Sequence, residues 1–221
     1  MTRPRLDSAL FRQHDVDTTA LTMNVAVIHA FAEAGRYDGL ILQGEGTVGN
    51  FALIVDSAEG ATQADIDLDV GQPTKLVWAS RVGSAGGSVY RLAPNGYGVF
   101  HVGGGMGGFA ARLGASGEAE KRPTFDTRSL EAGDLVAVTL LRPGRYEAVA
   151  SKTDGHAWLT VAYPDVKAGL KPAAPISVSV SERGFEPAEV FLVPTQGLLF
   201  QLNSGGQLKI ALREPDDGPQ P

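Results

Sequence analysis

Residues 135–163, LVAVTLLRPGRYEAVASKTDGHAWLTVAY, hold three short apolar runs separated by turn residues. The runs begin at Leu135, Tyr146 and Trp158, and each has the length of a β-strand. A Pro-Gly pair at 143–144 marks a tight turn between the first two runs. This region therefore predicts consecutive β-strands.

The same pattern continues on both sides of this region. DIDLDV at 65–70 alternates strictly, and ISVSVS at 176–181 alternates apolar residues with Ser. A helix would also be tolerated at 21–31, whose end is rich in Ala, but the alternation favours a strand. Pro94, Asn95 and Gly96 predict a turn between the strands at 89–92 and 97–102, because Asn-Gly readily adopts positive φ. Further strands are predicted at 21–31, 40–42, 51–55, 65–70, 75–80, 89–92, 97–102, 176–181, 190–193, 198–202 and 208–212.

The chain divides into segments of different composition. Residues 1–20 are polar and lack a regular period, and we interpret them as an N-terminal arm. The segment 164–175, PDVKAGLKPAAP, has the composition of a linker. We therefore predict a main β-sandwich at 21–163, a smaller C-terminal β unit at 176–212 and a tail at 213–221. About four strands are too few to bury the apolar residues of the C-terminal unit, so we expect the main sandwich or a partner to cover them.

Composition and charge exclude several classes of protein. The 221-residue chain has a formal net charge of −6 and no cluster of Lys and Arg, which disfavours nucleic-acid binding. It contains no Cys, which excludes disulfides, thiolate metal sites and Cys nucleophiles. No apolar run reaches the roughly 18 residues that a membrane helix needs, and the N-terminus has no signal-peptide core. We expect no membrane span and see no signal peptide.

Three stretches resemble the cupredoxin family. FEPAEVFLVPTQGLLFQLNSGG at 185–206 is similar to its opening strands. DIDLDVGQPTKLVWASR at 65–81 is similar to the branch that includes cytochrome oxidase subunit II. LRPGRYEAVASKTDGHAWLTV at 141–161 resembles the closing hairpin, which carries Cys, His and Met ligands in copper-binding members. The resemblance implies an all-β Greek-key sandwich, cupredoxin-like or immunoglobulin-like, and favours a periplasmic or other extracytoplasmic location.

The copper ligands of that family are missing at the matching positions. Ala150 occupies the Cys position, Thr153 the following His position, and Lys209 lies about where the first His would stand. A blue-copper centre needs a thiolate. We therefore expect a sandwich that holds no cofactor.

The remaining metal candidates come from the four His residues, none of which is spaced as a metal pair. In one hypothesis His101, Met106 and His156 converge on a soft metal such as copper. In the alternative, His101 is a hydrogen-bonded residue at a strand end and His156 lies in a solvated loop. The second interpretation is favoured.

Other motifs carry less chemistry. The Gly-rich loop at 103–108 contains G-x-G-x-x-G, but a phosphate site would need a helix at 109–113 and an alternating strand and helix pattern. We favour a loop whose glycines allow close backbone approach. Asp65, Asp67 and Asp69 lack the spacing of a calcium loop and are predicted to form a solvated strand face. No G-x-S-x-G elbow is present. The aromatic residues predicted to pack in the core or on a sheet face are Trp78, Tyr90, Tyr146 and Trp158.

Three hypotheses for function follow. In the leading one, the chain is no enzyme but a metal-less accessory or structural subunit, held by protein partners in a larger complex. The resemblance to the subunit II branch suggests a membrane-associated electron-transfer complex as the host. The alternative is a small-ligand or metal-binding module that uses the Gly-rich loop and His101. The third is an enzyme of a type that no motif identifies.

Overall fold

The structure, a computed structural model, describes residues 14–57, 60–69, 87–104, 107–164 and 173–218. These residues form strands and turns but no helix, so the all-β prediction is confirmed, whereas the Greek-key detail stays a prediction. In chain order the strands are β1 (Val16–Asp17), β2 (Val25–Phe31), β3 (Gly35–Gln43), β4 (Gly46–Val55), β5 (Ala61–Asp67), β6 (Ser88–His101), β7 (Phe109–Ala115), β8 (Phe125–Asp126), β9 (Leu135–Thr139), β10 (Gly144–Ala150), β11 (Ala157–Val161), β12 (Ile176–Ser181), β13 (Gly184–Glu186), β14 (Glu189–Leu192), β15 (Gly197–Leu202) and β16 (Leu208–Pro215).

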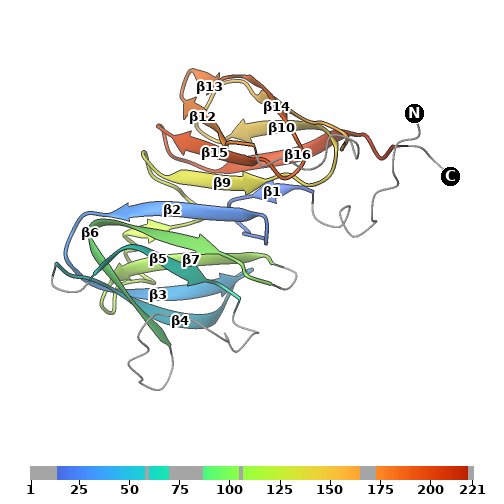
Figure 1. Ribbon diagram of the computed structural model, residues 1–221. Helices are drawn as coiled ribbons and strands as arrows, with labels where there is room; N and C mark the ends of the chain where they lie inside the picture. The colour runs from blue at the N-terminus through green and yellow to red at the C-terminus, as the bar shows by residue number, and fades with distance from the viewer. Residues whose placement is uncertain (1–13, 58–59, 70–86, 105–106, 165–172, 219–221) are drawn as a thin grey trace.

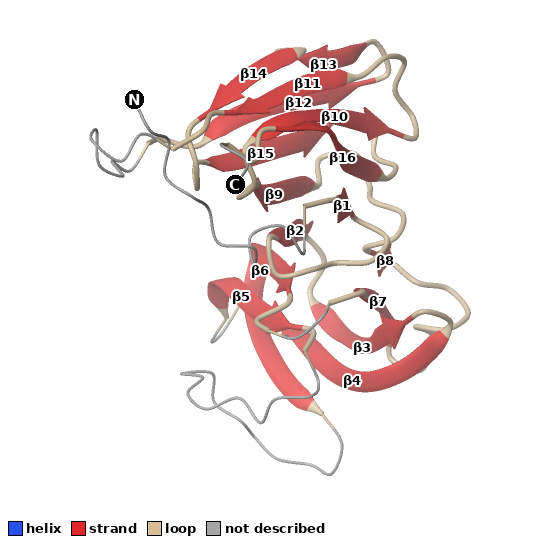
Figure 2. Cartoon of the chain, turned by 90° about the vertical axis from the view of Figure 1, so that its right-hand side faces the viewer, coloured by secondary structure: helices blue, strands red, loops and turns tan. Residues whose placement is uncertain are grey.

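The described strands form two sheets. The smaller sheet has five strands in the order β1-β16-β10-β11-β14. The larger has eleven strands in the order β13-β12-β15-β9-β2-β6-β4-β3-β7-β8, with β5 paired to β6. In Figure 1 strands β3 to β7 lie in a lower tier and β9 to β16 in an upper tier, and Figure 2 shows the same two tiers from the side. The larger sheet passes through both tiers, because β2 pairs with β6 on one side and with β9 on the other.

The strands of the C-terminal segment do not form a sheet of their own. Strand β15 pairs with β9, β14 pairs with β11, and β16 pairs with β10. Most apolar residues of this segment are thereby covered within the chain, and Val180, Phe200 and Leu202 are fully buried, whereas Phe191 and Val193 stay exposed. The predicted division of the chain into independently folding units stays a prediction.

The ends of the described chain are tied into the smaller sheet. Strand β1 lies within the segment predicted to be an arm and pairs with β16. Strand β16 itself continues to Pro215, inside the predicted tail. Asp217 then accepts two hydrogen bonds from Arg142, at 2.9 and 2.8 Å. These contacts hold residues 16–17 and 217 against the upper tier.

The turn predicted at 94–96 is wrong. Strand β6 runs through these residues without reversing, although Asn95 does adopt a positive φ of 63°. The pairing of β5 with β6 shifts here, so that Ala61 pairs with Leu92 but Gln63 pairs with Tyr97. The positive φ of Asn95 therefore belongs to a β-bulge, which an Asn-Gly dipeptide can form as readily as a turn. The strand predicted at 75–80 and Trp78 lie outside the described residues.

Tyr146 fixes one corner of the upper tier. Its side chain is fully buried, and its hydroxyl donates to the carbonyl oxygen of Arg142, four residues earlier, at 2.7 Å. A hydrogen bond of this kind is found at tyrosine corners of β-sandwiches. Burial raises the pKa of Tyr146 to about 12.

We expect Tyr146→Phe to change how stability depends on alkaline pH. Because the pKa is higher in the folded state than the ordinary tyrosine value of 10.0, the wild-type chain keeps this contribution below pH 10.0 and loses it as pH rises to about 12. That loss amounts to roughly 2–3 kcal/mol. Urea unfolding across this pH range should show a shallower decline for Tyr146→Phe than for wild type. Tyr97→Phe, which changes an exposed ring, is the control; equal slopes for all three chains would contradict the assignment.

Candidate functional site

A His-Asp pair, in which the Asp is buried and the His is partly buried, joins the two tiers. Asp134, directly before β9, is 3% exposed, and its Oδ1 lies 2.6 Å from Nδ1 of His29 in β2. Its Oδ2 accepts a hydrogen bond from the backbone N–H of Glu131 at 2.7 Å. The His29 ring packs on Phe125, with ring centroids 4.4 Å apart, and meets the edge of Phe31 at 4.7 Å. The pair therefore ties the strand shared by both tiers to the start of β9.

This pair has two of the three groups of a Ser-His-Asp triad. In the described part of the chain, however, no side chain hydrogen-bonds to Nε2 of His29. The pair is accordingly suited to holding β2 and β9 together. Sequence reasoning missed it, although one signal was present: His29 is in phase with Val25, Val27 and Phe31, the buried side of β2. A His on that side requires a polar partner.

An aromatic and charged surface covers the outer side of β14, β11 and β10, in the upper tier of Figure 2. Phe191 is 73% exposed in the middle of β14. Its cross-strand partner is Thr160, and Trp158 lies two residues before Thr160 on the same side of β11. The guanidinium of Arg145 stands over the Trp158 ring at 4.0 Å. We call these four residues the Phe191 face.

The charged groups beside the Phe191 face are paired with one another. Glu147 is bound by Arg213 at 2.8 Å and lies 3.6 Å from Nδ1 of His156. Arg145 reaches Glu214 at 3.8 Å. With these charges compensated, Phe191 is the most exposed apolar side chain described on this surface, ahead of Val149 and Val193. Its exposure follows from the sequence EVFL at 189–192, in which Val190 and Leu192 point inward and Phe191 takes a position that alternation assigns to a polar residue.

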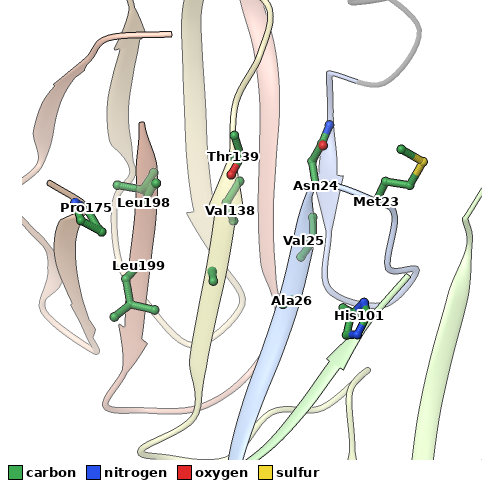
Figure 3. A pocket seen from close by; sticks show the side chains of 12 residues that line it. Met23, Asn24, Val25, Ala26, His101, Val138, Thr139, Pro175, Leu198 and Leu199 are labelled. Atoms are coloured by element: carbon green, nitrogen blue, oxygen red, sulfur yellow. The ribbon is translucent and has the colours of Figure 1, made fainter. Parts of the chain in front are cut away.

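A groove crosses the outer side of the larger sheet, where the tiers meet (Figure 3). Ala26 of β2 and Ala137 of β9 are register partners. His101 pairs with Ala26 on one side, and Leu199 pairs with Ala137 on the other. Two small side chains between two large ones leave a hollow of about 470 Å³. We call it the Ala26 groove.

The three metal candidates from the sequence have different places. His101 lines the Ala26 groove, and Met106 lies outside the described residues. His156 lies in the exposed loop directly before β11, with its ring centroid 5.2 Å from that of Trp158. Among the described residues no three His, Asp or Glu side chains are grouped as a metal site. Whether any of these residues binds a metal stays a prediction.

The Gly-rich loop is fastened at both described ends. The backbone N–H of Gly103 donates to Oδ1 of Asp67 at 2.8 Å, and that of Gly108 donates to the carbonyl oxygen of Leu21 at 2.8 Å. A Cβ at Gly103 would lie within van der Waals overlap of the Asp67 carboxylate. Close approach therefore explains Gly103, whereas Gly108 adopts a positive φ of 84°. Strand β7 occupies the residues that a phosphate site would need as a helix.

Other predicted positions are also placed by the structure. Tyr146 is a core residue and Tyr90 packs edge-on against Phe51, with ring centroids 5.9 Å apart. Ala150 pairs with Leu208, whereas Lys209 pairs with Val149 and therefore points to the opposite side of the sheet. The positions matching two copper ligands of the cupredoxins consequently do not face each other.

Comparison of the chain with protein-family models, with curated proteins and with solved structures gave no match. A search of the described residues for a helix able to cross a membrane found none.

Proposed function

We propose that this chain is a non-catalytic accessory subunit that binds another protein through the Phe191 face. The observation that carries the proposal is the 73% exposure of Phe191 within a regular strand. A large aromatic side chain in water forgoes roughly 1.5–3 kcal/mol of burial. A partner that covered it would recover this free energy.

The neighbours of Phe191 support the same proposal. Trp and Arg are enriched among the residues that dominate binding energy at interfaces, and here Arg145 stacks on Trp158. The stacking restricts both side chains before binding, which reduces the entropy lost on association. The proposed partner is a protein in a larger assembly. The sequence resemblance favours a membrane-associated electron-transfer complex as that assembly.

The experiment compares Phe191→Thr with Val48→Thr in the full-length chain, expressed in its natural cells and separated by size under mild conditions. Val48 is also exposed, at 41%, but belongs to β4 in the lower tier. Wild type and Val48→Thr should elute in a large complex. Phe191→Thr should shift toward the 23.1 kDa monomer, since losing a central aromatic contact costs about 2 kcal/mol or more, roughly a thirtyfold change in affinity.

Folding is checked separately by thermal unfolding. Because Phe191 is exposed, the substitution should change stability by only about 0.5 kcal/mol. A folded Phe191→Thr chain that elutes with wild type would refute the proposal. So would a wild-type chain that elutes as a monomer.

A further inference from the structure

The Ala26 groove has the shape of a binding site. Its floor is the Ala26 and Ala137 pair, and its sides are His101 and Leu199. One row further along the strands, the larger pair Ile28 and Leu135 fills the same side of the sheet. The hollow therefore ends at this row. A volume of about 470 Å³ falls within the range of about 300–1,000 Å³ that is usual for small-molecule sites.

Polar side chains lie among the apolar ones. Asn24 and Thr139 flank the end of the groove away from Ile28, and His101 forms one side (Figure 3). The backbone N–H of Thr139 donates to the carbonyl oxygen of Asn24, but within the described residues the side chains of Asn24, Thr139 and His101 make no hydrogen bond. A few polar groups in an apolar hollow can orient a ligand.

Among the described residues, the charged groups closest to the groove are carboxylates, and no described Lys or Arg lines it. On the side of His101, β5 brings two carboxylates to the same outer face: Asp67 pairs with His101, and Asp65 pairs with Val99. An anionic ligand would be repelled by these groups and a cationic one attracted, more weakly as salt rises.

We propose that the Ala26 groove binds a small amphipathic molecule with an apolar body and a positively charged head. The apolar body lies on the two alanines between His101 and Leu199. The head lies toward Asp65 and Asp67. This site is separate from the Phe191 face, which belongs to the other sheet, so either proposal can fail without the other.

Three probes with the same eight-carbon tail and different head groups test which head charge the groove prefers. They are n-octylammonium, n-octanol and n-octanoate, each titrated calorimetrically into the full-length chain at pH 7. We expect octylammonium to bind most tightly, octanol more weakly and octanoate most weakly. The preference for octylammonium should fall as sodium chloride rises from about 50 to 500 mM. Octanoate binding as tightly as octylammonium would overturn the assigned charge.

Substitutions that fill the groove test whether the ligand binds there. Ala137→Leu and Ala26→Leu, on neighbouring strands, should each weaken octylammonium binding by about tenfold or more. Ala30→Leu is the matched control, because Ala30 is exposed on the same side of β2 beyond Ile28. Circular dichroism identifies the variants that fold. If either folded variant binds octylammonium as wild type does, or if Ala30→Leu weakens binding equally, the site is not the Ala26 groove.

The carboxylates are tested by Asp65→Asn, which removes an exposed charge. This variant should bind octylammonium about two- to threefold more weakly and octanol unchanged. An equal loss for both probes would show that the substitution perturbs the fold and that charge does not select the ligand.

Discussion

A chain that ends at residue 173 is expected to aggregate rather than to fold as a monomer. The deletion removes β12 to β16, and with them the pairing partners of β9, β10 and β11. Three strands then present open edges, which promotes association with other chains. The deletion also removes side chains whose exposed fraction is 1% or less, including Val178, Val180, Phe200, Leu202 and Ile210.

The expected loss is comparable with the whole free energy of unfolding of an ordinary domain. At about 1.5–3 kcal/mol for each buried side chain, five of them contribute roughly 8–15 kcal/mol, against a usual total of about 5–15 kcal/mol. Size exclusion and binding of an apolar dye measure the outcome. A truncated chain that stays monomeric and unfolds cooperatively, as the full chain does, would show that β9 to β11 do not depend on the C-terminal strands.

The second large effect is expected for Asp134→Ala, which should lower the free energy of unfolding by about 3–5 kcal/mol. The substitution leaves His29 without its partner and removes the acceptor of the Glu131 N–H. Asp134→Asn keeps the shape and one acceptor oxygen, so its cost should be smaller. Urea unfolding gives both values, with Glu120→Ala as the control because this carboxylate is exposed.

A double-mutant cycle measures the interaction between His29 and Asp134 separately from the other contacts of each residue. His29→Ala and Asp134→Ala together should cost less than the sum of the single substitutions, with a coupling of about 1–3 kcal/mol. Strict additivity would mean that the two side chains stabilise the fold independently, and the joint between the tiers would lie elsewhere.

Local apolar patterns were sufficient to predict most strands. The runs at 176–181 and 198–202 appear as β12 and β15, in which buried and more exposed side chains alternate. The run at 51–55 appears at the end of β4 as a continuous, mostly buried apolar segment. The reversal at Asn95 could not be told from a bulge, because both use positive φ.

The pairing between distant strands could not be predicted in this way. Strands β9 and β15 are more than fifty residues apart, and their apolar patterns would fit several partners. The Ala26 groove depends on that register, since Ala26 and Ala137 meet only when β2 lies beside β9. Phe191, in contrast, could have been found from the sequence, because it breaks the alternation of β14.

Photo-crosslinking from position 191 is the most direct test of whether this chain binds another protein through the Phe191 face. Phe191 is replaced by benzoylphenylalanine in the full-length chain, which is irradiated in its natural cells, and the same replacement at Val48 serves as the control. We expect a product of one discrete higher mass from position 191 and none from position 48. No discrete product from position 191, or the same product from both positions, would contradict the proposal that the Phe191 face binds a specific protein.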